Sequence, residues 1–75
     1  MEAKVLRHKS LDGRHGIIVQ GVLYTSGDHI VPQLFPATAT VEWLLESINK
    51  RDREAAKNMI ANDFELVPVI WRYFK

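Results

Sequence analysis

Apolar and polar residues alternate near the start of the chain, which is typical of β-strands. Residues 3–11 alternate imperfectly, whereas residues 17–24 (IIVQGVLY) form the best strand pattern of the sequence. Residues 12–16 (DGRHG) between them contain the Asp-Gly and Gly signals of a turn. The pattern therefore predicts an N-terminal hairpin, with a bulge or bend at Gly21 and a short third strand at residues 29–31.

Helical spacing follows further along the chain. One apolar stripe recurs at i, i+3, i+4 and i+7, namely Val41, Leu44, Leu45 and Ile48. Thr38 or Thr40 is placed to cap the free amides at its start. Asp52 is a good N-cap for a second apolar face, made by Ala55, Ala56, Met59 and Ile60. The sequence favours two helices with a break at residues 49–51 over one continuous helix from 41 to 61.

The C-terminal segment again has the composition of a strand. Residues 64–74 (FELVPVIWRYF) predict a closing strand, which Pro68 would place at a sheet edge or interrupt with a bulge. A chain of 75 residues allows one hydrophobic core, so residues 1–75 are expected to form a single small domain. The predicted fold class is α+β, with a helical hairpin packed on one face of an antiparallel sheet of three to four strands. That sheet combines the N-terminal hairpin and the C-terminal strand, in the order β-β-(β)-α-α-β.

Composition narrows the class of protein. The chain has no cysteine, which excludes disulfides and thiolate zinc sites and is compatible with a reducing compartment. Neither a signal-like start nor a run of eighteen apolar residues is present, so we expect a cytoplasmic location without membrane contact. A domain of this size has a thin stability margin, and association into a homodimer is one way to widen it.

Charge is balanced overall but unevenly distributed. Ten Lys or Arg residues oppose nine Asp or Glu residues, giving a net charge of +1. One basic group in the predicted hairpin supplies candidate nucleic-acid contacts: Lys4, Arg7, Lys9 and Arg14. A second basic group lies at the inter-helix break: Lys50, Arg51, Arg53 and Lys57. Dedicated nucleic-acid binders are usually basic overall and carry aromatics among their basic residues, and this chain has neither feature. Nucleic-acid binding is therefore the alternative hypothesis and not the leading one.

No pattern of catalytic or ligand residues stands out. The histidines and nearby carboxylates of the hairpin region match no compact metal-ligand spacing; they are His8, Asp12, His15, Asp28 and His29. Ser26, Asp28 and His29 resemble a catalytic triad by letters alone, yet neighbours in a tight turn rarely reach triad geometry. The glycines lie in the strand region and not between a strand and a helix, where phosphate-binding loops occur. We therefore expect no enzyme activity, no metal site and no cofactor.

The C-terminal strand carries the strongest interface signal. Val69, Trp71 and Tyr73 would share one side of that strand, and exposed aromatics beside basic residues are typical of protein interfaces. Trp43 lies off the apolar stripe of the first helix and would extend an apolar surface. The competing interpretation is that a domain this small buries its aromatics. The leading hypothesis is a small non-enzymatic protein-binding or assembly module, which uses these four residues to bind a protein partner or a second copy of itself.

Overall fold

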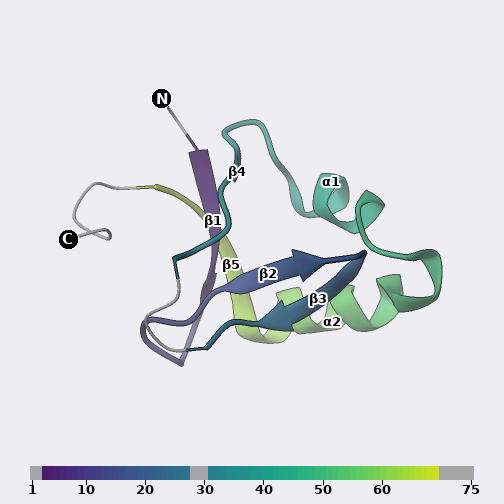
Figure 1. The fold of residues 1–75 in the computed structure, drawn as a ribbon, viewed down its shortest axis with the longest axis horizontal. Coiled ribbons are helices and arrows are strands. Elements are labelled where there is room, and N and C mark those ends of the chain that lie inside the picture. Colours follow the sequence, from purple (N-terminus) through teal and green to yellow (C-terminus); the bar gives the residue numbers. More distant parts are fainter. Residues whose placement is uncertain (1–2, 28–30, 70–75) are drawn as a thin grey trace.

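The fold is that of a computed structural model, which describes residues 3–27 and 31–69 (Figure 1). The strands are β1 (Ala3–His8), β2 (Gly16–Val19), β3 (Val22–Thr25), β4 (Phe35–Pro36) and β5 (Phe64–Pro68). The helices are α1 (Val41–Glu46) and α2 (Arg53–Asp63), with a 3₁₀ turn at Lys50–Asp52 before α2. Strands at both ends with helices between them confirm the α+β class and the predicted element order.

β1 is the centre of a three-stranded antiparallel sheet with the order β4-β1-β5. Its longer partner is β5, in a register that places Val5 opposite Val67, and β4 pairs with its first two residues. β2 and β3 form a separate two-stranded antiparallel sheet. An isolated bridge between Arg7 and His15 links the end of β1 to the start of this hairpin. The two sheets are therefore joined at that point.

The hairpin of this region is β2–β3 and not the predicted pairing of residues 3–11 with 17–24, because residues 17–24 fold back on themselves. The chain turns at Gln20 and Gly21, whose φ angles are 50° and 77°. Two consecutive positive φ values are typical of the type I′ turn, which matches the twist of a two-residue hairpin. Gly21 is thus a turn residue and not a bulge. The short strand predicted at residues 29–31 is not found at Val31, which lies in no strand, and residues 29–30 fall outside the described residues. The next strand after the hairpin is β4.

The predicted break between two helices is confirmed, and of the two predicted cap residues, Thr38 and Thr40, the structure uses Thr40. Its Oγ1 accepts a hydrogen bond from the Trp43 amide (3.1 Å) at the start of α1. Asp52 makes no side-chain cap on α2, contrary to prediction. The 3₁₀ turn replaces this cap, since the Arg53 amide donates to the Lys50 carbonyl.

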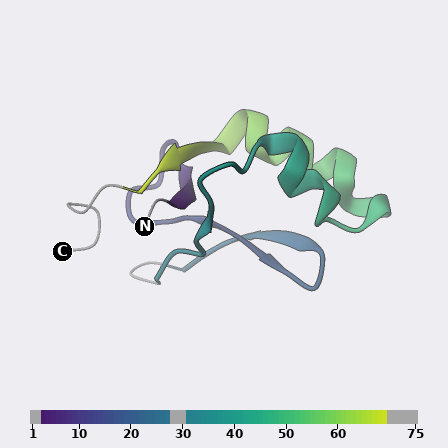
Figure 2. The same ribbon diagram turned by 90° about the horizontal axis from the view of Figure 1, so that it is seen from above.

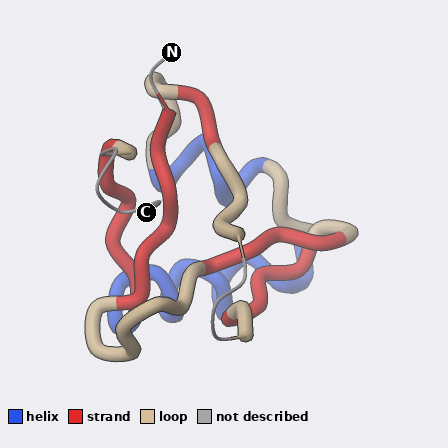
Figure 3. The backbone as a smooth tube through the Cα atoms, turned by 60° about the vertical axis from the view of Figure 1, so that its left-hand side comes forward, coloured by secondary structure: helices blue, strands red, loops and turns tan. Residues whose placement is uncertain are grey.

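β5 follows α2 without a loop, because Phe64 both ends the helix and begins the strand. Its amide donates to the Ile60 carbonyl, while its own backbone is extended. Figure 3 shows β5 running beside β1. Pro68 lies at the end of this edge strand, as predicted for a residue that cannot donate to a ladder. The rest of the predicted closing strand, residues 70–74, lies outside the described residues.

The hydrophobic core draws on both helices and both sheets. Its buried members are Leu6, Leu23, Phe35, Ala39, Leu44, Ile48, Ala56, Ile60 and Phe64. Figure 2 shows α1 and α2 on one side of the β2–β3 hairpin, so that the other side of the hairpin faces away from them. Gly16 is buried at the start of β2, where the Leu6 side chain occupies the space that a Cβ would need. β1 and the hairpin therefore meet in close contact.

Asn49, at the break after α1, holds the tip of the hairpin. Its amide donates to the Gly21 carbonyl (2.8 Å), and its Nδ2 donates to the Gln20 carbonyl (3.1 Å). The approach is so close that Asn49 Oδ1 occupies the space that a Cβ at Gly21 would need. The position of the hairpin tip therefore depends on glycine at this place in the turn.

Replacing this glycine with alanine (Gly21→Ala) should lower the free energy of unfolding by about 1–3 kcal/mol, from backbone strain alone. The overlap of the new Cβ with Asn49 should add to that loss, which urea denaturation measures. Gly13→Ala is the matched control, because Gly13 has nearly the same φ (79°) in an exposed turn. Equal losses in the two variants would show that the Asn49 contact adds nothing.

Candidate functional site

Lys4 and Lys9, two of the four predicted nucleic-acid contacts, bind carbonyl oxygens of their own chain. Lys4 Nζ donates to the Ala39 carbonyl (3.0 Å), just before α1. Lys9 Nζ donates to the Ala61 carbonyl (2.9 Å), near the end of α2. Because a cation there complements the negative end of a helix, Lys9 has a structural role. Arg14 is half-buried, and its side chain hydrogen-bonds to none of the described residues.

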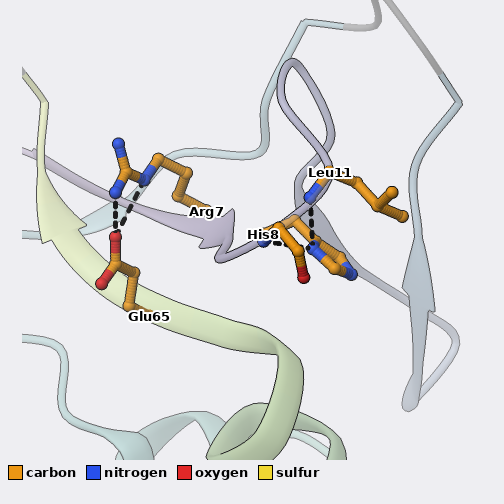
Figure 4. A network of polar contacts seen from close by, with 5 residues as sticks. Arg7, His8, Leu11 and Glu65 are labelled. Carbon is orange, nitrogen blue, oxygen red and sulfur yellow. Dashed lines mark hydrogen bonds and ion pairs between the residues drawn. The ribbon is translucent and has the colours of Figure 1, made fainter.

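Arg7, the remaining predicted contact, pairs with Glu65 across β1 and β5 (Figure 4). Its Nε donates to Glu65 Oε1 at 2.9 Å, and its Nη2 donates to the same oxygen. The two residues are direct neighbours in the register of the strands. Both side chains are partly exposed, so the pair contributes at most about 1 kcal/mol to stability. The carboxylate nevertheless offsets the charge that a nucleic acid would use.

His8 organises the turn after β1. Its Nδ1 accepts hydrogen bonds from the amides of Ser10 (3.1 Å) and Leu11 (2.9 Å), the latter labelled in Figure 4. The ring also packs edge-on against Phe64, with centroids 5.1 Å apart. One imidazole nitrogen is thus engaged by the backbone and is not oriented toward a metal. Among residues 3–27 and 31–69, no group of three or more His, Asp or Glu side chains could hold a metal ion.

Ser26 is buried, and its side chain hydrogen-bonds to the backbone at the open end of the β2–β3 hairpin. Its Oγ accepts from the His15 amide (2.9 Å) and donates to the Gly27 carbonyl (3.1 Å). The hydroxyl therefore binds backbone groups where the β2–β3 ladder ends, as serine side chains commonly do in turns. Asp28 and His29, which completed the triad by letters, lie outside the described residues.

His15 combines partial burial with an unpartnered nitrogen. Within the described part of the chain its Nδ1 is buried and has no hydrogen-bond partner. Burial lowers the pKa of His15 below its ordinary value of 6.5, and the positive charge of Arg7 lowers it further. The folded protein therefore favours a neutral imidazole at this position.

The free energy of unfolding should fall as the pH is lowered through the ordinary histidine pKa, because the unfolded chain binds a proton that folded His15 resists. The contribution is fully present above about pH 6.5 and is lost toward the lower pKa of the folded state. His15→Gln should flatten this slope in denaturation curves measured between about pH 8 and pH 5. An NMR titration that places the His15 pKa at or above its ordinary value would contradict the prediction.

The residues predicted to form a protein interface are only partly placed. Trp43 is 42% exposed on α1, so it does lie on the surface. Val69 is half-buried, and its amide donates to the Ala3 carbonyl (2.9 Å), which continues the pairing of β5 with β1. Trp71 and Tyr73 lie outside the described residues, and their contact with a partner stays a prediction.

An apolar surface that sequence reasoning missed covers the outer side of the β2–β3 hairpin. Ile18 and Leu23 point toward the core, so the alternating residues point away from it. These are Ile17, Val19, Val22 and Tyr24, which form two cross-strand pairs. Val19 and Tyr24 are each 49% exposed, and no residue from 17 to 27 is charged. The signal was available in the sequence, because residues 17–24 are apolar on both faces of any strand they form.

The outer edge of β3 lies beside this surface. The Ile18 amide points away from β3, since it donates to Gln33 Oε1 (2.8 Å). Ile18 lies opposite Leu23, and such a non-bonded pair in an antiparallel ladder aims the backbone groups of both residues outward. Thr25, two residues on, aims its backbone groups the same way. Among the described residues, none hydrogen-bonds to these groups of Leu23 and Thr25, and no strand pairs with β3 on that side.

Comparison with protein-family models, with curated proteins and with solved structures finds no match to this chain. Within the described residues, no helix is both long enough and apolar enough to cross a membrane. The candidate site therefore rests on its own geometry: an open strand edge bordered by uncharged side chains.

Proposed function

We propose that the chain is a small non-enzymatic assembly module, which binds a second copy of itself by pairing strands at the open edge of β3. The observation that carries this proposal is the set of outward backbone groups on Leu23 and Thr25, which no described residue pairs. Addition of a strand to a sheet edge is a recurrent mode of protein recognition, in which main-chain hydrogen bonds supply affinity.

The chemistry of the edge favours a second copy as the partner. Edge strands that stay unpaired are usually protected by Lys, Pro or a bulge, and β3 (VLYT) has none of these. The segment from 17 to 27 carries no charge, so two copies bring no like charges together. An antiparallel edge also complements itself, because each residue offers one donor and one acceptor. These properties make the pairing of β3 with another β3 favourable.

The expected complex is weak and depends on concentration. Each hydrogen bond contributes about 1 kcal/mol net, and a short strand forms few of them. The exposed side of Tyr24 adds apolar contact, because side chains of neighbouring strands on one sheet face cover each other. We place the module in the cytoplasm, because a chain without cysteine forms no disulfide and so needs no oxidising compartment.

Light scattering should show the mass rising from that of one chain toward that of two across about a hundredfold range of concentration. Thr25→Pro should hold the mass at one chain, because proline removes an outward amide. It breaks no bond of the hairpin, since Thr25 and Gly16 form a non-bonded pair.

Trp43→Ala is the companion variant, and it should associate as the unmodified chain does. Association lost in Trp43→Ala but kept in Thr25→Pro would move the interface to α1 and overturn the proposal. A mass of one chain at every concentration for the unmodified protein would also overturn it.

The alternative function, nucleic-acid binding, is favoured by the exposure of Lys50, Arg51 and Lys57 around the inter-helix turn. The side chains of Lys4, Arg7 and Lys9 already bind groups of distant elements. In the second basic group Arg51 also pairs with a carboxylate, Asp52 (3.7 Å), but its side chain is 85% exposed, so this group is the better candidate. On this hypothesis the protein is retained on DNA or RNA at low salt, and Arg51→Glu weakens that retention. Absence of retention at low salt would remove the hypothesis.

A further inference from the structure

We infer that two copies pair about a two-fold axis at Tyr24, so that β3 and its counterpart become the central strands of a four-stranded antiparallel sheet. This inference rests on the proposed function and adds the register of the contact. It follows from which backbone groups of the hairpin are already bonded.

The outward groups define the first step. In an antiparallel ladder the residues of a bonded pair exchange both of their hydrogen bonds. Leu23 and Thr25 each have a free outward amide and carbonyl among the described residues. Pairing Leu23 of one copy with Thr25 of the other uses all of these groups at once. That register places Tyr24 opposite Tyr24 of the second copy.

The neighbouring registers are less favourable because they need groups that are already bonded. Moving the axis to Leu23 would pair Thr25 with Gly21, whose carbonyl accepts from the Asn49 amide (2.8 Å). Moving it to Thr25 would pair Leu23 with Gly27, whose carbonyl accepts from Ser26 Oγ (3.1 Å). The register centred on Tyr24 disturbs neither bond.

The tyrosines themselves favour this register. Tyr24 belongs to the outer face of the hairpin and is 49% exposed. At the two-fold axis its backbone groups point back to β2, so the two tyrosines form a non-bonded pair with Cα atoms about 4.5 Å apart. Aromatic side chains at such cross-strand positions attract each other. The contact would cover the exposed ring with its own counterpart.

The chain has no cysteine, so a single substitution gives a unique thiol that reports the register. Tyr24→Cys should form a disulfide-linked dimer under mild oxidation, because a Cα separation of about 4.5 Å lies within the disulfide range. Val19→Cys is the matched control, since Val19 has the same 49% exposure on the same face but belongs to β2, one strand away from the edge. We expect Tyr24→Cys to cross-link at least about tenfold faster than Val19→Cys, because the contact raises its effective concentration.

The outcomes separate the register from the function. Association of the unmodified chain with equal or faster cross-linking of Val19→Cys would overturn the register and leave the assembly in place. Absence of association together with absence of cross-linking would overturn both.

A second pair of variants tests the axis without a covalent bond. Tyr24→Lys and Tyr24→Glu should each stay monomeric, because like charges would face each other across the axis, whereas their equimolar mixture should form a heterodimer. Failure of the mixture to associate, while the unmodified protein does, would overturn the placement of Tyr24 on the axis.

Discussion

The contact between Asn49 and the tip of the β2–β3 hairpin decides how the hairpin lies in the fold. One residue supplies two donors, its amide and its side-chain Nδ2, to the two carbonyls of the turn. Two hydrogen bonds from one residue fix the position of the tip relative to the inter-helix break, although Gln20 and Asn49 are both exposed. With its tip held at the inter-helix break, the hairpin packs Leu23 into the core and turns Tyr24 away from it. The alternation of side chains along β2 and β3 then separates an inner face from an outer face.

Other contacts determine which backbone groups of the hairpin are covered. β2 begins beside the end of β1, through the bridge between Arg7 and His15, and Gln33 accepts the hydrogen bond of its outward amide at Ile18. β3 lies on the other side of the hairpin, where no described strand or side chain pairs with it (Figure 1). The helices cover the inner face of the hairpin and leave the opposite face uncovered (Figure 2). Packing of the core thus leaves an uncharged strand edge and an apolar face exposed next to each other.

Local signals in the sequence predicted local structure, whereas they did not show which distant strands pair. The cap at Thr40 and the break after α1 depend on residues within a turn or two of each other, and both were predicted. Arg7 and Glu65 are 58 positions apart, and no local pattern shows that β1 pairs with β5 at all. The basic residues of the N-terminal segment looked like one cationic surface for the same reason, since their partners lie in distant elements. The turn at Gly21 was not predicted because a glycine inside a segment rich in β-branched residues fits both a bulge and a hairpin, and the preceding glutamine rarely adopts positive φ. With the turn misplaced, the exposed face and edge of the hairpin were missed, although residues 17–24 are apolar on both faces of any strand they form.

Self-association at β3 would couple assembly to stability. A two-stranded hairpin is the least stable kind of sheet, since it is marginal in water without further strands or a packed face. Here one face is packed and the other is exposed, so the hairpin depends on its inner contacts and on the Asn49 attachment. A contact that forms only with the folded hairpin stabilises the folded state by mass action. Pairing two copies at β3 would give each hairpin two additional strands, placing the gain at the smaller of the two sheets. The second copy would then supply the strand partner that β3 lacks on its outer edge, and the added contacts would widen the thin stability margin of a small domain.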